Sequence, residues 1–175
     1  HSAKDMPTDC PAGLSLSAFV ERDDPRDVLI LKDGMDTPKV MATGSPRRQA
    51  QLKDRFPQCA WIQLRGNVET RLRKIAEQDE AGGTILAAAG LARLGLTGYP
   101  GLKFMHLPVS EMVPAAGQGA IALQTRSGDK DEYVRLGNPT TQNDVSIERR
   151  VLESQGGGCQ IALGVCVQQG NLHFF

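Results

Sequence analysis

Arginine residues that could bind an anion follow three successive segments that we predict to be strands. They are Arg47 and Arg48, with Thr43 and Ser45, after the first segment, Arg65 and Arg71, with Gly66, after the second, and Arg93 after the third. A guanidinium group binds a carboxylate through two parallel hydrogen bonds, and helix starts present free backbone N–H groups to anions. The pattern therefore predicts a site for an anionic ligand. The alternative is that these arginines are ordinary solvated helix residues.

Two further residues could take part directly in chemistry. Asp5 follows Lys4 in HSAKD, and a carboxylate there could transfer a proton or stabilise a cation, although the spacing equally fits a polar turn. Cys159 follows three glycines in SQGGGCQIALG, which predicts an accessible thiol. Such a thiol could be a buried filler, a nucleophile or an attachment point, and no His or Asp lies nearby in the sequence to activate it.

The composition is that of a globular protein and narrows the possible partners. Of the 175 residues, 40% are hydrophobic and 23% charged, and no apolar run approaches the roughly 20 residues that cross a bilayer, so we expect no membrane partner. The four cysteines are far apart and form no CxxC pair, which argues against a metal site and a disulfide-rich scaffold. A reducing, cytoplasmic setting is the simplest interpretation.

The charge distribution favours a small anionic ligand. The formal net charge is zero, which argues against a nucleic-acid partner. Residues 26–113, however, hold 13 Lys and Arg against 9 Asp and Glu, while the rest of the chain holds 7 against 11. The middle of the chain is therefore basic and its flanks are acidic.

Strand and helix patterns alternate through this basic middle. We predict strands at 40–43, 60–64 and 84–89, each followed by a helix, the last of them short and turning at Gly95. Ser45 and Asn67 are suited to cap the first two helices, and Pro46 fits a first helical position. This order predicts a parallel sheet with crossover helices, in which ligands bind beyond the carboxyl ends of the strands.

The flanking segments predict further elements. Residues 13–20 indicate a strand, 21–27 a charged hinge, 114–126 a glycine-rich turn into a strand, and 138–158 a capped helix that ends in glycine. From Ile161 onwards, apolar residues alternate with small ones, which predicts a half-buried strand. The final NLHFF is typical of the start of a strand or hairpin.

Seven stretches, in this order, resemble the porphobilinogen deaminase (hydroxymethylbilane synthase) family and cover nearly the whole chain. They are HSAKDMPTDCPAGL, ERDDPRD, TGSPRRQAQL, LRGNVETRLRK, LAAAGLARLGL, PAAGQGAIAL and GGGCQIALG. The resemblance implies an α/β fold with two lobes like those of periplasmic binding proteins, plus a small α+β third domain. The implied limits are 1–25 for the end of the first segment of domain one, 26–113 for domain two, 114–137 for the return to domain one, and 138–175 for part of domain three.

The resemblance also implies a reaction. Family members are transferases of tetrapyrrole and heme biosynthesis, which join four porphobilinogen units into hydroxymethylbilane and release ammonia at each step. A dipyrromethane cofactor, bonded to a cysteine through a thioether, primes the chain, and that cysteine matches Cys159. The catalytic aspartate of the family matches Asp5. A carboxylate at that position would stabilise the positive charge that develops when porphobilinogen loses ammonia.

Family positions that hold the acidic arms of cofactor and substrate match the arginine-rich junctions. The cofactor-binding matches are Ser2, Lys4, Thr43, Ser45, Arg47, Arg48, Arg65, Gly66, Arg71 and Gln118, and the substrate-binding matches are Arg65, Arg71 and Arg93. The chain departs from the family at Gly44, where a second Ser is common, and at Pro46, where Leu is common. We expect altered ligand contacts there, with the site preserved.

Family members have further residues before HSAKD and after Phe175. We therefore expect these 175 residues alone to be inactive. A second chain or a missing segment would complete domain one, and apart from that we expect the protein to be a monomer. The alternative function is a non-catalytic module that binds carboxylates or other anions, with a receptor-like fold. Such a module would need neither Asp5 nor Cys159.

Overall fold

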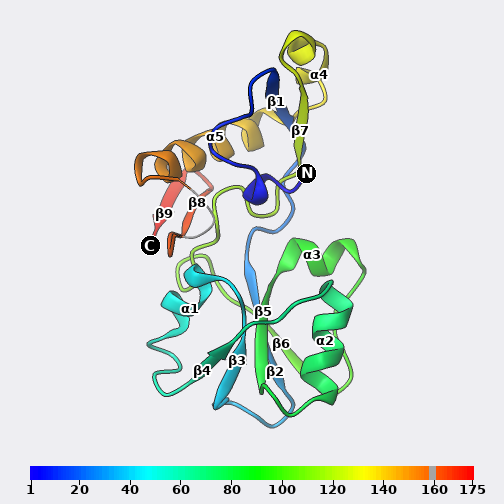
Figure 1. Ribbon diagram of the computed structural model, residues 1–175, viewed down its shortest axis with the longest axis vertical. Coiled ribbons are helices and arrows are strands. Elements are labelled where there is room, and N and C mark those ends of the chain that lie inside the picture. Colours follow the sequence, from blue (N-terminus) through cyan, green and yellow to red (C-terminus); the bar gives the residue numbers. More distant parts are fainter. Residues whose placement is uncertain (158–160) are drawn as a thin grey trace.

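The computed structural model describes residues 1–157 and 161–175 as a mixed α/β structure with two lobes (Figure 1). The strands are β1 (Leu14–Phe19), β2 (Asp27–Lys32), β3 (Val40–Ala42), β4 (Ala60–Ile62), β5 (Gly83–Ala87), β6 (Leu102–His106), β7 (Ala122–Arg126), β8 (Val165–Gln168) and β9 (Asn171–Phe174). The α-helices are α1 (Pro46–Leu52), α2 (Val68–Glu77), α3 (Ala88–Arg93), α4 (Lys130–Val134) and α5 (Pro139–Ser154), and two 3-10 turns span Ala3–Asp5 and Ser127–Asp129.

The five-stranded lobe, which contains β2–β6 and α1–α3, is one sheet with helices on both faces (Figure 1). The strand order is β4-β3-β5-β2-β6, and β3 is parallel to both β4 and β5. The predicted parallel unit is confirmed for these three strands, but β2 runs antiparallel to both of its neighbours. The reason is that the chain enters and leaves this lobe at one edge, where Val28 pairs with His106, so β2 runs away from that edge and β6 returns to it.

Strand β2 is the centre of the hydrophobic core. Successive side chains of a strand point to opposite faces of the sheet. Val28 and Ile30 accordingly pack in the cluster that contains α2 and α3, whereas Leu29 and Leu31 pack in the cluster that contains α1. All four side chains are at most 2% exposed, and each such burial stabilises the fold by about 1.5–3 kcal/mol.

Two helix starts at the edge of this sheet follow the predicted capping pattern. The Ser45 hydroxyl accepts a hydrogen bond from the backbone N–H of Arg48, and Pro46 is the first residue of α1. The Asn67 side chain accepts from the backbone N–H of Thr70 at 2.8 Å and begins α2. These caps fix where each helix begins, and so they fix the arginine positions relative to the ends of β3 and β4.

The second lobe contains β1, β7, α4, α5, β8 and β9 (Figure 1). Strands β1 and β7 form an antiparallel pair, and β8 and β9 form a hairpin. The predicted half-buried strand from Ile161 was wrong in two respects: β8 begins only at Val165, and its residues Val165, Cys166 and Val167 are all buried. Helix α5 packs against β8, and the Cys166 side chain lies in a cluster with Val109 and Val113.

A buried carboxylate on α5 holds the second lobe together. Glu148 is 0% exposed and receives both terminal nitrogens of Arg22, at 2.6 and 3.2 Å. It also accepts the backbone N–H groups of Gly117 and Val167, each at 2.7 Å. Glu148 therefore joins the hinge, the glycine-rich return loop and β8 at one point.

None of the helices that the structure describes combines the length and the apolar character needed to span a bilayer. Within residues 1–157 and 161–175, no group of three or more His, Cys, Asp or Glu side chains is arranged to hold a metal ion.

Substitution Glu148→Gln should destabilise the protein by about 3 kcal/mol, because it leaves the Arg22 charge buried without its counter-ion and replaces one acceptor oxygen by a donor. Urea unfolding followed by circular dichroism measures the change. Glu153→Gln, an exposed position on the same helix, is the matched control and should change the free energy of unfolding by less than about 0.5 kcal/mol. Equal effects of the two substitutions would contradict the role given to Glu148.

Candidate functional site

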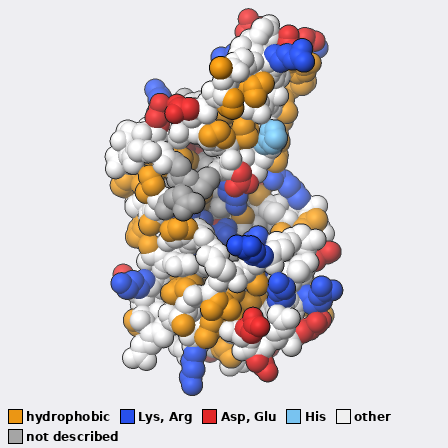
Figure 2. All heavy atoms as spheres, viewed as in Figure 1, with side chains coloured by type: hydrophobic (Ala, Val, Ile, Leu, Met, Phe, Trp, Pro, Cys, Tyr) orange, Lys and Arg blue, Asp and Glu red, His pale blue; other side chains and the backbone are white. Residues whose placement is uncertain are grey.

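A cavity of about 450 Å³ lies where the two lobes meet. The space-filling view shows a hollow between the lobes with Lys and Arg side chains beside it (Figure 2). The cavity is lined on one side by the N-terminal residues 4–8, the return loop and the segment around the end of α5. The ends of β3 and β4 and the starts of α1 and α2 supply the rest of the lining. The lining residues are Lys4–Thr8, Thr43–Arg48, Gln63–Arg65, Arg71, Ala115, Ala116, Gln118, Leu152, Ile161 and Leu163.

The structure brings nine of the predicted site residues to this cavity. They are Lys4, Asp5, Thr43, Ser45, Arg47, Arg48, Arg65, Arg71 and Gln118. Because β3, β4 and β5 are parallel, their three junctions with the following helices lie at the same edge of the sheet. The first two junctions supply cavity residues and the third does not.

Asp27 organises the first junction. It is 0% exposed, and its two carboxylate oxygens lie 2.8 Å from Nη1 of Arg47 and 2.7 Å from Nη2 of Arg48. Burial opposes ionisation of Asp27, but the charges of Arg48 and Arg47 and their hydrogen bonds outweigh it and lower its pKa to about 2. The same arginines donate to backbone carbonyls, Arg47 to Val113 and Arg48 to Ile85. Part of each guanidinium group is therefore committed to the protein.

Gln118 connects this ion cluster to the hinge. Its side chain is 0% exposed, and its Nε2 donates to Oδ1 of Asp27 at 3.0 Å and to the carbonyl of Pro25 at 2.7 Å. Its own backbone carbonyl accepts from Nε of Arg22 at 2.9 Å. The two lobes are thus joined through a continuous set of polar contacts behind the cavity.

Lys4 and Asp5 lie on the opposite wall, in the 3-10 turn Ala3–Asp5. Nζ of Lys4 lies 3.5 Å from Oε1 of Gln118. Burial, together with the charge of Arg48, lowers the pKa of Lys4 to about 8, although Asp5 and Asp27 act in the opposite direction. Asp5 itself is exposed to solvent at the cavity. The arrangement presents an accessible carboxylate beside a predominantly cationic wall.

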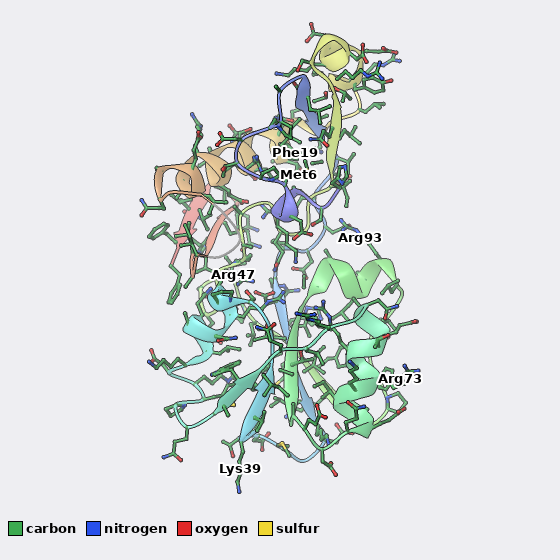
Figure 3. The ribbon with its side chains drawn as sticks, viewed as in Figure 1. Met6, Phe19, Lys39, Arg47, Arg73 and Arg93 are labelled. Atoms are coloured by element: carbon green, nitrogen blue, oxygen red, sulfur yellow. The ribbon has the colours of Figure 1, made fainter. Side chains whose placement is uncertain are left out.

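Three predicted residues lie outside the cavity lining. The hydroxyl-bearing Ser2 forms a β-bridge with Ile121, and Gly66 has a φ of 124° that favours glycine. The Nη2 group of Arg93 lies 2.6 Å from Oδ2 of Asp23 and donates to the carbonyl of Gly119 at 2.8 Å. The stick view shows Arg93 extending from α3 towards the second lobe, apart from Arg47 at the start of α1 (Figure 3). Arg93 therefore contacts the hinge rather than the cavity.

Cys159, the predicted attachment point, lies outside the described residues. The described chain on both sides of it reaches the cavity, because Leu152 near the end of α5, and Ile161 and Leu163 further along, all belong to the lining.

Asp27 and Gln63 are two residues of the site that sequence reasoning missed. An acidic residue directly before the apolar run VLIL could have pointed to Asp27, because a charge at the start of a buried strand needs a partner. Gln63 carries no comparable signal.

The lobes and the cavity between them define an α/β protein that can bind a ligand with several carboxylates. Residues 1–133 match the family model described as porphobilinogen deaminase, dipyromethane cofactor binding domain. The chain therefore belongs to the porphobilinogen deaminase family.

Curated relatives carry that name. The chain is 42% identical over 183 residues to porphobilinogen deaminase of Syntrophomonas wolfei subsp. wolfei, covering 99% of this chain and 58% of the relative. It is also 42% identical over 173 residues to that of Chromobacterium violaceum, covering 94% of this chain and 54% of the relative. The chain spans a little more than half the length of these relatives.

Two solved structures resemble the chain only weakly. The P235GK mutant of ArgBP from T. maritima gives a TM-score of 0.40 at 15% identity, covering 81% of this chain and 58% of that one. The B. pertussis BvgS periplasmic domain gives 0.43 at 18% identity, covering 82% and 30%. Both TM-scores lie below 0.5, so the fold is described by its own strand order.

Substitution Asp27→Asn should destabilise the protein by about 3 kcal/mol, since Arg47 and Arg48 would keep buried charges without a counter-ion. The folded-state pKa of about 2 lies below the ordinary value of 3.8, so the contribution of Asp27 is fully present above about pH 4. As the pH falls through about 2, about 2 kcal/mol of stability should be lost. Denaturant unfolding between pH 2 and pH 7 measures both effects.

The exposed Asp33→Asn variant is the control and should follow the unsubstituted protein across this range. An Asp27→Asn variant that matches this control at pH 7 would contradict the ion cluster.

Proposed function

We propose that this chain is the pyrrole-binding and catalytic part of a porphobilinogen deaminase. The full-length protein would join four porphobilinogen units into hydroxymethylbilane, with loss of ammonia at each step. The observation that carries the proposal is the accessible Asp5 carboxylate at a cavity whose other charged residues, among those that the structure describes, are Lys4 and four arginines. Membership of the family supports it. A cytoplasmic location belongs to the same proposal, since the described cysteines Cys10, Cys59 and Cys166 are free thiols.

The cavity residues fit a dipyrromethane attached at Cys159. Each pyrrole carries an acetate and a propionate, so two joined pyrroles bring four carboxylates. The guanidinium groups of Arg65 and Arg71 would hold these carboxylates. Arg47 and Arg48 would add the N–H groups that are not already bound to Asp27 or to backbone carbonyls. The volume of about 450 Å³ lies within the range of small-molecule sites. When bound, the cofactor supplies the carbon nucleophile to which the first substrate pyrrole is joined.

Asp5 would act on the substrate. When the C–N bond of the protonated aminomethyl group of porphobilinogen breaks, ammonia leaves with the bonding electron pair and the positive charge passes to the pyrrole. A carboxylate that accepts the pyrrole N–H stabilises that charge as it forms. Asp5 can then accept the proton that the α-carbon loses when the new C–C bond is made. The cationic wall opposite holds the acidic arms and so orients the ring, which lets one carboxylate serve both steps.

Cofactor attachment can be tested by mass. Full-length protein should have a mass increased by two pyrrole units, located on the peptide that contains Cys159, and Cys159→Ala should remove the increase. Cys10→Ala, which removes another free and partly exposed thiol, is the control and should retain it. A bare mass in protein that still binds porphobilinogen would instead indicate a module that only binds carboxylates.

Substitution Asp5→Asn in the full-length protein should leave cofactor attachment intact and reduce turnover by at least about 100-fold, since it removes the charge and the proton acceptor. Release of ammonia from porphobilinogen measures the rate. Asp9→Asn, an exposed aspartate of the same loop that does not line the cavity, is the matched control and should remain near the unsubstituted rate. A near-normal rate for Asp5→Asn would refute its role.

A further inference from the structure

Gly44 and Gln63 share one space at the cavity wall. Gly44 lies between Thr43 and Ser45 at the end of β3, and Gln63 directly follows the neighbouring parallel strand β4. A Cβ atom on Gly44 would fall 3.4 Å from Cδ and 3.7 Å from Nε2 of Gln63, and too close to its Oε1 for any real contact. The Gln63 carboxamide therefore occupies the place that a side chain at position 44 would take.

The Gln63 carboxamide is available to a ligand. Gln63 is exposed and lines the cavity together with Gly44, and its side chain has no hydrogen-bonding partner among residues 1–157 and 161–175. The cations Arg65 and Arg71 line the same wall, and Arg71 is oriented by its Nε–H, which donates to the carbonyl of Gly66 at 2.7 Å. A neutral amide among these cations adds no charge but adds a directional donor.

We propose that Gln63 is a further ligand-contacting residue, whose amide N–H donates to a carboxylate of the pyrrole ligand in place of a side chain at position 44. The inference rests on the proposed function. The arginines bind carboxylates through charge-assisted hydrogen bonds, and the Gln63 amide, when it turns towards the ligand, adds one further N–H donor at this point of the wall. Gln63 would therefore set how the ligand is placed along the wall between Ser45 and Arg65.

The steric overlap makes the two positions interdependent. A serine at position 44 would displace the flexible end of the Gln63 side chain, and Gln63 also lines a second cavity of about 230 Å³. Gly44→Ser should therefore weaken ligand binding when Gln63 is present. In a Gln63→Ala background, the same serine meets no obstacle and can supply its own hydroxyl.

The test uses full-length protein and porphobilinogen as the probe. Gln63→Ala should raise the KM about tenfold, as expected for the loss of a hydrogen bond to a charged group, and should leave kcat within about twofold. Gln58→Ala, an exposed glutamine outside the cavity, should leave both unchanged. Thermal unfolding of each variant should stay at the unsubstituted midpoint, because Gln63 is exposed. A KM for Gln63→Ala equal to that of Gln58→Ala overturns the inference and leaves the proposed function intact.

The double-mutant cycle is the second readout. Gly44→Ser alone should raise the KM, whereas adding it to Gln63→Ala should leave the KM unchanged or lower it. Additive increases would overturn the shared space. If unsubstituted full-length protein shows no turnover, the proposed function fails, and the same cycle measured on the Kd of porphobilinogen by calorimetric titration still decides whether Gln63 contacts the ligand.

Discussion

The ion cluster of Asp27 with Arg47 and Arg48 is the interaction on which the rest of the site depends. A single buried carboxylate at the start of strand β2 pairs with two arginines at the start of α1, and Gln118 of the return loop donates to the same carboxylate. Charges this deeply buried are tolerated only when they are paired and hydrogen-bonded. The cluster therefore fixes the edge of the sheet, the first turn of α1 and the return loop relative to one another, and the remaining arginine N–H groups become a rigid part of the cavity wall.

Glu148 does for the second lobe what Asp27 does for the first, and Arg22 and Gln118 connect the two clusters. Both carboxylates accept hydrogen bonds from segments that are far apart in the chain, so each adds a polar connection to elements that also pack through hydrophobic clusters. The hinge residues between the lobes are consequently tied on both sides. A further tie comes from Arg93, which pairs with Asp23 at the solvent-exposed side of the same hinge. Arg93 also donates to the carbonyl of Gly119, so its side chain connects the end of α3 with the hinge and the return loop.

The cavity combines a fixed wall with an adaptable rim. Arg47, Arg48 and Gln118 are buried and held by several bonds, whereas Asp5, Arg65 and Gln63 are exposed to the cavity. Fixed donors suit the recognition of acidic groups that stay in place, and exposed groups suit a ligand that changes during the reaction. Gly44 has no side chain and so leaves room at the rim for the carboxamide of Gln63, which directly follows β4.

The sequence by itself determined the local elements: capping residues placed the starts of α1 and α2, and the strand–helix alternation correctly predicted that β3, β4 and β5 are parallel, which put two arginine-rich junctions at one edge. It also identified the family. Tertiary structure alone decided that β2 runs antiparallel, that β8 is covered on both faces, and that Asp27 and Glu148 hold the lobes together. The physical reason is that the two kinds of interaction act over different distances along the chain. Caps and periodicity act within a few residues, whereas the partners of a buried charge come from whichever distant segments the fold brings to it. For that reason the sequence placed Arg93 after the third strand of the parallel unit, whereas only the tertiary structure showed its contact with Asp23.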